Sequence, residues 1–229
     1  KNIQIQLSRS LFLFLSTIFF FYSISIISLT ESLTLAFIYP ILVTLLSATI
    51  LKEKVGLRRW IAVIVGFIGV IIILRPGFNT ISLASLAALG TGICYSFYVI
   101  TTRKLSSLDS PLLTLIFTGL VGAIIISLIV PFVWITPSYN QLIIMIGLAL
   151  AGTIGHFLLI LSFNFAESSK LAPFAYFEIV TNILIAYYFF GDFPDIWIWA
   201  GLIIIISSGV YIIVREHVVK KINTDPTIH

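Results

Sequence analysis

The sequence contains few charged residues. Only 10% of its 229 residues are Asp, Glu, Lys or Arg, whereas 59% are hydrophobic, and the mean hydropathy is +1.15. A soluble domain carries about 25% charged residues. This composition excludes an ordinary soluble domain and predicts an all-α integral membrane protein that crosses the bilayer several times.

Cysteine and catalytic motifs are also scarce. The single Cys94 rules out an internal disulfide. The sequence has no H-E-x-x-H, no G-x-S-x-G, no Cys/His cluster and no acid-rich loop for a metal. We therefore expect no enzyme, no cofactor and no metal. The net charge of +4 does not indicate nucleic-acid binding, because the basic residues lie in short loops.

Eight apolar stretches each approach the 17–25 residues that a helix needs to cross a bilayer. A short basic lead, residues 1–9, precedes them, and a polar tail that frays is expected from Arg215. Turn chemistry separates several stretches, for example at Ser110-Pro111. The predicted spans are about 10–29, 31–51, 57–74, 81–102, 111–134, 140–164, 169–190 and 195–214.

The basic residues fall almost entirely on one side of these spans. With residues 1–9 placed in the cytoplasm, twelve Lys and Arg residues are cytoplasmic and Arg75 alone lies outside. This positive-inside bias predicts a multi-pass protein of the cytoplasmic (inner) membrane with both termini in the cytoplasm. The cytoplasmic residues are Lys1, Arg9, Lys52, Lys54, Arg58, Arg59, Arg103, Lys104, Lys170, Arg215, Lys220 and Lys221.

A faint internal repeat relates the two ends of the chain. A constant shift of 139 residues lays the first three spans over the last three without gaps. Five spans, an odd number, separate each pair, so the copies have opposite orientations. Inverted repeats with a site near the midplane are a common plan in transporters. The residues that coincide include Trp60 with Trp199, Ala36 with Ala175, Ile64 with Ile203, and the acids Glu53 with Asp192.

Several motifs are spread over both halves of the chain. They are Ala172-Pro173-Phe174-Ala175-Tyr176-Phe177-Glu178, Phe189-Phe190-Gly191-Asp192-Phe193-Pro194-Asp195, the run from Gly201 to Tyr211, Tyr39-Pro40, Lys52-Glu53, Arg59-Trp60 and Gly66-Phe67-Ile68-Gly69. Together they resemble the drug/metabolite transporter superfamily, and within it the EamA type, including bacterial S-adenosylmethionine-uptake-like members. The resemblance covers essentially the whole chain.

The resemblance implies ten helices in two inverted five-helix repeats, with both termini cytoplasmic. With eight spans, this chain would lack the first two helices, and its start at Lys1 without an initiator Met also leads us to expect an N-terminal truncation. Residues 1–76 would then be the last three helices of the N-terminal repeat. Residues 77–215 would be the complete C-terminal repeat, and 216–229 a cytoplasmic tail.

Glu178 is the first candidate for a substrate-binding residue. Counted from Ser169, it lies roughly 13–14 Å into a span that crosses a hydrocarbon core about 30 Å thick. An acid at that depth is a functional hypothesis by default. It would bind a cationic group or carry a proton; the alternative is a neutral or paired glutamate that fixes helix packing. Asn182 shares its stripe, and either lines the site or bonds a neighbouring helix.

Further candidates are one histidine and several aromatic residues. His156 could relay a proton or bind substrate, or could be a packing histidine. Tyr95 and Tyr98 share one face of a span with Thr91 and Thr102, which suits a cavity that stacks on a cationic or planar ligand. Helix packing or the headgroup belt is the alternative. The weaker candidates are Tyr176, Tyr22, Phe37 and Tyr39.

Pro40 falls in the middle of the second predicted span. Its ring removes a backbone donor and clashes with the carbonyl of Ala36, so we expect a kink there. The kink could act as a hinge in a carrier or be a static bend.

We interpret these features as a secondary-active transporter that moves a small polar or cationic metabolite by alternating access. S-adenosylmethionine or an amino-acid-like molecule would fit, with proton or exchange coupling, and membrane lipids surround the helices. One alternative is an exporter of drugs, amines or metabolites with the same fold. An integral-membrane enzyme would need a recognisable motif, and a pore or scaffold would need rings of polar groups.

Overall fold

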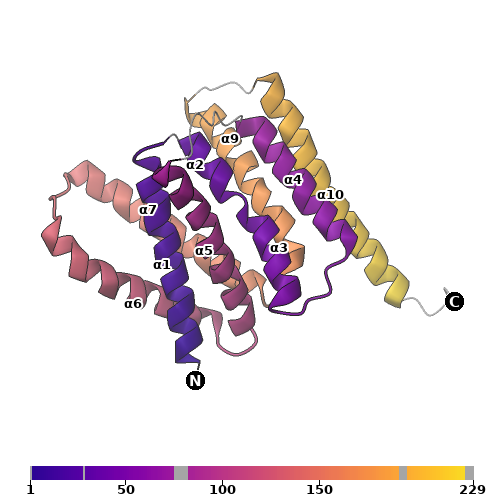
Figure 1. Ribbon diagram of the computed structural model, residues 1–229, viewed down its shortest axis with the longest axis horizontal. Helices are drawn as coiled ribbons and strands as arrows, with labels where there is room; N and C mark the ends of the chain where they lie inside the picture. The colour runs from indigo at the N-terminus through magenta and orange to yellow at the C-terminus, as the bar shows by residue number, and fades with distance from the viewer. Residues whose placement is uncertain (1, 28, 75–81, 191–194, 225–229) are drawn as a thin grey trace.

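The computed structural model describes residues 2–27, 29–74, 82–190 and 195–224. All secondary structure in this part of the chain is helical, with no strand, as the composition predicted. Figure 1 shows the helices side by side in one bundle. In order they are α1 (Ile3–Ile24), α2 (Leu29–Ala36), α3 (Tyr39–Thr49), α4 (Leu57–Leu74), α5 (Leu83–Leu105), α6 (Pro111–Ile129), η1 (Val130–Phe132), α7 (Tyr139–Ser162), α8 (Ser168–Leu171), η2 (Ala172–Tyr176), α9 (Phe177–Phe190) and α10 (Ile196–Thr224).

Five stretches of the described chain are long and apolar enough to cross a membrane. They are Ile3–Ile24, Ser32–Thr49, Leu83–Leu105, Pro111–Phe132 and Tyr139–Ser162, and α10 contributes a shorter apolar stretch, Ile196–Tyr211. The chain is therefore a multi-span membrane protein, and each of the eight predicted spans contains at least one helix.

Both ends of the chain differ from the expected polar lead and fraying tail. Residues 3–9 of the expected lead already belong to α1, which begins at Ile3, and Arg9 is fully buried in the bundle. At the other end, α10 continues to Thr224, so the stretch after Arg215 is helical as far as it is described. Hydropathy underestimates a helix whose terminal turns are polar, since those turns contribute little to the apolar signal.

The second predicted span, 31–51, is two helices. α2 ends at Ala36, and α3 begins at Tyr39 with Pro40 in its first turn. Proline cannot donate a backbone hydrogen bond to the preceding turn, so a helix can begin there but not run through without distortion. The chain therefore breaks just before Pro40, close to where we expected a kink.

The seventh predicted span, 169–190, is also interrupted. Its start belongs to the short helix α8, the 3₁₀ helix η2 follows with Pro173 in its first turn, and α9 starts only at Phe177. Glu178 therefore lies in the first turn of α9 and not in the middle of a continuous helix.

Helices α4 and α10 pack closely along small residues. A Cβ added at Gly201 would lie 2.8 Å from the carbonyl oxygen of Gly69 and 2.4 Å from Ile73. The Ser208 hydroxyl donates to the carbonyl of Ala62 at 2.8 Å. Close backbone approach and a hydrogen bond to a carbonyl are the usual means of joining helices in lipid, where no hydrophobic force drives association.

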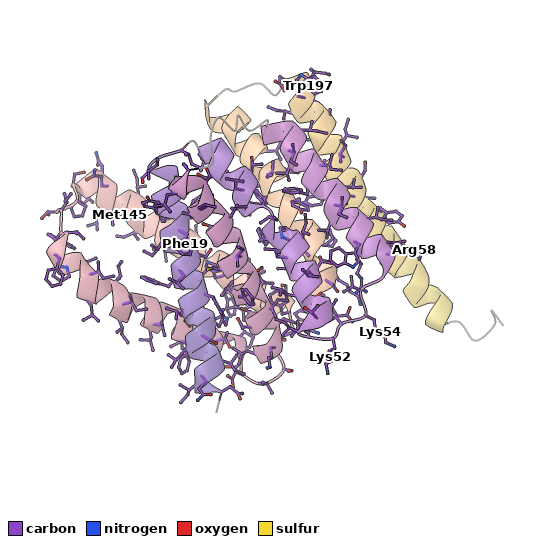
Figure 2. The ribbon with its side chains drawn as sticks, in the orientation of Figure 1. Phe19, Lys52, Lys54, Arg58, Met145 and Trp197 are labelled. Carbon is purple, nitrogen blue, oxygen red and sulfur yellow. The ribbon has the colours of Figure 1, made fainter. Side chains whose placement is uncertain are left out.

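Polar contacts tie together the end of the bundle that carries Lys52, Lys54 and Arg58, which we call the basic end; Figure 2 shows Trp197 at the opposite end. There the Glu53 carboxylate accepts bonds from the backbone N–H groups of Ser168 and Ser169 at 3.2 and 3.1 Å. Partial burial alone would raise the pKa of Glu53, but these bonds and those from the serine hydroxyls outweigh it and lower the pKa.

Two ion pairs complete this network at the basic end. Arg103 pairs with Glu53 at 3.5 Å, and Arg59 pairs with Glu167 at 2.9 Å and also donates to Ser169. These contacts join α4 and α5 to the loop and short helix that follow α7, so they fix the basic end as one unit.

Helices α6 and α7 lie apart from the rest along much of their length, as Figure 1 shows. Only 6% of the residues in the most apolar stretch of each of these two spans are buried inside the protein, whereas 56% are buried in that of α5. The exposed side chains are almost all apolar, as suits surfaces that face lipid.

Candidate functional site

Two cavities lie on either side of a pair of tyrosines in the bundle. One, of about 260 Å³, we call the Glu178 cavity; the other, of about 250 Å³, we call the Ser168 cavity because it reaches that residue near the basic end. Tyr39 and Tyr95 line both cavities. Their rings meet edge to face with centroids 4.8 Å apart. The pair therefore forms the partition between the two spaces.

The interruption before α3 shapes one wall of the Glu178 cavity. Helix α5 approaches it so closely at Gly92 that an added Cβ would lie 2.6 Å from the carbonyl oxygen of Ala36. Both residues line the cavity. Any larger residue at 92 would push α5 away from the end of α2.

Glu178 supplies the acidic group of this cavity. Its side chain is exposed to the open space rather than packed, and it lies within electrostatic range of Tyr39 and Tyr95. No side chain in the described ranges forms a hydrogen bond or ion pair with it. The first turn of α9 favours a negative charge, because its backbone N–H groups point toward that end of the helix. The carboxylate is thus available to a ligand.

His156, on α7, lines the same cavity as Glu178. Its Nδ1 lies 3.1 Å from the Tyr98 hydroxyl, and the two rings are perpendicular with centroids 5.6 Å apart. The structure thus places the predicted site residues Glu178, Tyr95 and His156 around one cavity, together with the weaker candidates Phe37 and Tyr39.

Tyr98 lies behind His156 and is fully buried. It contacts Arg9, whose guanidinium lies 4.7 Å from the centre of the Tyr98 ring and donates to its hydroxyl at 3.2 Å. Thr102, on the same face of α5, accepts from Arg9 Nε at 2.7 Å. Tyr98 therefore connects a buried cation to the cavity histidine.

Sequence reasoning missed Arg9 because it was assigned to a cytoplasmic lead. A signal was present: polar residues recur on one side of α1 at helical spacing, which indicates a buried polar face. The buried residues of α1 are Gln6, Arg9, Ser10, Ser16 and Ser23.

The remaining candidates occupy different places. Tyr176 is fully buried against Gly66 and Phe37, and its hydroxyl has no partner in the described part of the chain. Tyr22 is exposed near the end of α1 and is not among the residues that line the two cavities. The side chain of Asn182 lies outside the described residues, as does Asp192. The described residues contain no group of three or more His, Cys, Asp or Glu that could hold a metal.

Comparison with known proteins identifies the family of this chain. The model of the EamA-like transporter family matches residues 2–75 and 82–215. The S-adenosylmethionine uptake transporter of Rickettsia prowazekii (strain Madrid E) is 28% identical over 212 residues, covering 93% of this chain and 72% of that protein. The riboflavin transporter of Vibrio cholerae (strain ATCC 39315 / El Tor Inaba N16961) is 30% identical over 190 residues, covering 80% of this chain and 61% of the relative.

A solved crystal structure shares the fold. Its TM-score is 0.80 at 16% identity, with 91% of this chain and 77% of that chain covered. The relatives named above are transporters and not enzymes, in agreement with the absence of catalytic motifs from the sequence. The chain belongs to the EamA-like transporter family.

Proposed function

We propose that this protein is a secondary-active carrier and that the Glu178 cavity binds a small cationic metabolite. The observation that carries the proposal is the Glu178 carboxylate, which borders a cavity and has no partner in the described part of the chain. An unpaired acid inside a membrane protein is costly to keep charged, and a cationic ligand would offset that penalty.

The aromatic lining favours the same ligand class. Tyr39, Tyr95 and Phe37 line the cavity beside Glu178. Aromatic faces attract cations, by about 0.5–2 kcal/mol per ring depending on solvent exposure. An organic cation such as the sulfonium and ammonium of S-adenosylmethionine fits this combination better than a neutral flavin, although relatives of both kinds occur.

The two cavities suggest how access alternates. The Ser168 cavity extends toward the basic end, and the Glu178 cavity lies on the other side of the Tyr39–Tyr95 pair. Movement of α3 or α5, each of which carries one tyrosine, would join the two spaces. The break before Pro40 gives α3 a place to pivot relative to α2. We propose this break as the hinge of the rocking motion.

The test is uptake of radiolabelled S-adenosylmethionine into proteoliposomes, with and without an imposed pH gradient. Saturable uptake that unlabelled S-adenosylmethionine inhibits is expected, and a dependence on the gradient would identify proton coupling. Glu178→Gln should abolish uptake. The matched control, Asp195→Asn, removes a carboxylate that caps α10 through the Ile198 N–H, and should leave uptake unchanged. Equal uptake by wild type and Glu178→Gln would overturn the site assignment.

A drug or amine exporter remains the second candidate, since the same acid and tyrosines would bind an amine. Uptake measured in proteoliposomes of known orientation distinguishes the directions. Substrate that enters the liposomes only through carrier molecules whose cytoplasmic side faces the outer medium would favour export.

A further inference from the structure

We propose that His156 binds a carboxylate of the substrate through Nε2–H, and that Arg9, acting through Tyr98, is the positioning residue that keeps the proton on Nε2. The inference rests on the proposed function, because it describes the second half of the same site. Glu178 would bind the cationic group and His156 the anionic one, so the preferred substrate class is a zwitterion of the amino-acid type.

The first step concerns Arg9, which can only donate hydrogen bonds. Its side chain is completely buried. Nε donates to Thr102, Nη1 to the carbonyl of Thr114 at 3.1 Å and to the Thr118 hydroxyl, and Nη2 to the Tyr98 hydroxyl at 3.2 Å. The described ranges supply no carboxylate within ion-pairing distance of it. Arg9 is therefore a buried positive charge held only by neutral groups.

The second step concerns the Tyr98 hydroxyl. Because Arg9 donates to its oxygen, the hydroxyl proton is free to point at another acceptor, and His156 Nδ1 lies 3.1 Å away. A Nδ1 that accepts this bond carries no proton of its own, so the neutral ring has its proton on Nε2. Protonating both nitrogens would place a second positive charge within electrostatic range of Arg9.

The third step concerns the cavity. His156 lines it, and with Nδ1 occupied by Tyr98, the ring can offer only Nε2–H to a ligand. Arg9 bonds the same Tyr98 hydroxyl that contacts Nδ1, so its positive charge lies on the Nδ1 side of the ring and adds to the positive potential at this donor. A carboxylate bound there would be stabilised by the donor and by the charge. The opposite group of the same ligand would meet the Glu178 carboxylate in a space of about 260 Å³.

The tautomer can be measured without any ligand. The protein contains three histidines, so ¹⁵N-histidine labelling in lipid bilayers gives few signals, and His156→Gln identifies the one from the cavity. Solid-state NMR should show a protonated Nε2 and an unprotonated Nδ1 for His156 at neutral pH. Tyr98→Phe, which keeps the ring and removes the hydroxyl, should redistribute the proton. A protonated Nδ1 in the wild type, or an unchanged tautomer in Tyr98→Phe, would overturn the proposed control of the His156 tautomer by Arg9 and Tyr98.

Ligand preference tests the carboxylate contact. The probes are S-adenosylmethionine and its decarboxylated analogue, which keeps the sulfonium and the amine. The wild type should bind S-adenosylmethionine about tenfold or more tightly than the analogue, since a charge-assisted hydrogen bond contributes at least that much. His156→Phe should abolish the preference and Tyr98→Phe reduce it, while affinity for the analogue stays within about twofold.

The outcomes separate this inference from the proposed function. Equal wild-type affinity for both probes would overturn the carboxylate contact and leave the cation site at Glu178 intact. Failure of the wild type to bind either probe would overturn the cationic substrate, and the carboxylate contact with it.

Discussion

Tyr39 and Glu178 occupy corresponding places in two interrupted helices. They are 139 residues apart, which equals the shift of the internal repeat predicted from the sequence. Each lies immediately after an interruption, Tyr39 at the start of α3 and Glu178 in the first turn of α9. Both line the same cavity and lie within electrostatic range of each other. The proposed site is thus built where two broken helices meet.

Replacing Tyr95 should weaken binding of a cation through loss of the ring and not of the hydroxyl. Tyr95→Ala should raise the Kd for S-adenosylmethionine by roughly 3- to 30-fold, the magnitude of a partly desolvated cation–π contact. Tyr95→Phe should stay close to wild type. Equilibrium binding to purified protein measures both. A large loss in Tyr95→Phe would show that the hydroxyl, and not the aromatic face, contributes the affinity.

The contact between α4 and α10 predicts a strong effect at Gly201. Gly201→Ala places a methyl group 2.8 Å from the Gly69 carbonyl oxygen, and overpacking of this kind costs about 1–3 kcal/mol. The thermal unfolding temperature in detergent should fall. Gly152→Ala is the control, because a Cβ there meets nothing within 4 Å. That change should be neutral or stabilise α7 by up to about 1 kcal/mol. Equal effects of the two changes would refute the close packing.

Lys52 has a φ of 55°, in the left-handed region. It lies two residues after Ile50, the C-cap of α3, and the next N–H, that of Glu53, bonds back to the Ser47 carbonyl at 3.0 Å. Lys52→Gly should therefore stabilise the protein by about 1 kcal/mol, because glycine adopts this conformation without strain. Lys54→Gly lacks this benefit and serves as control. Chemical unfolding measures the free energy of unfolding of each protein. A value for Lys52→Gly below that of the wild type would argue against the left-handed conformation.

Glu53 predicts a pH dependence of stability. Its pKa is lowered in the folded state, so its contribution is fully present above the unfolded pKa of about 4.3 and is lost as the pH falls through the lower folded value. Glu53→Gln should lower the free energy of unfolding at pH 7 by about 1–3 kcal/mol, as expected for bonds to a charged acceptor. The difference should shrink below pH 4.

The control for this prediction is Glu167→Gln. The Glu167 carboxylate, which pairs with Arg59, is more exposed than that of Glu53, and exposed ion pairs contribute only about 0–1 kcal/mol to the free energy of unfolding. Thermal unfolding of the three proteins between pH 3 and pH 7 measures both effects. A Glu53→Gln difference that does not change with pH would contradict a charged Glu53.

Hydropathy predicted the all-helical membrane fold because apolar length is a property of the sequence alone. The chemistry of Pro40 placed a distortion close to the observed break, since proline acts on its own turn. It did not predict the 3₁₀ segment before Glu178, where Pro173 lies in the first turn of η2 and the helix restarts at Phe177. Which geometry follows a proline is decided by tertiary packing, here around the buried Tyr176.

The candidate site was predicted in part. Glu178, Tyr95 and His156 were singled out as polar or aromatic residues within apolar spans, and they line one cavity. Arg9 was not, because a count of basic residues near a terminus cannot distinguish a cytoplasmic lead from the first turns of a buried helix. Its partners Tyr98 and Thr102 are about 90 residues away, and only the fold brings them together.

Binding of S-adenosylmethionine to purified wild type and to Glu178→Gln tests the central claim most directly. The proposed cation site predicts saturable binding by the wild type and a loss of affinity of at least about tenfold in the variant, because an amide cannot neutralise the bound cation. The two proteins should have the same unfolding temperature within a few degrees. An unchanged Kd in Glu178→Gln would contradict the assignment of Glu178 as the cation-binding residue.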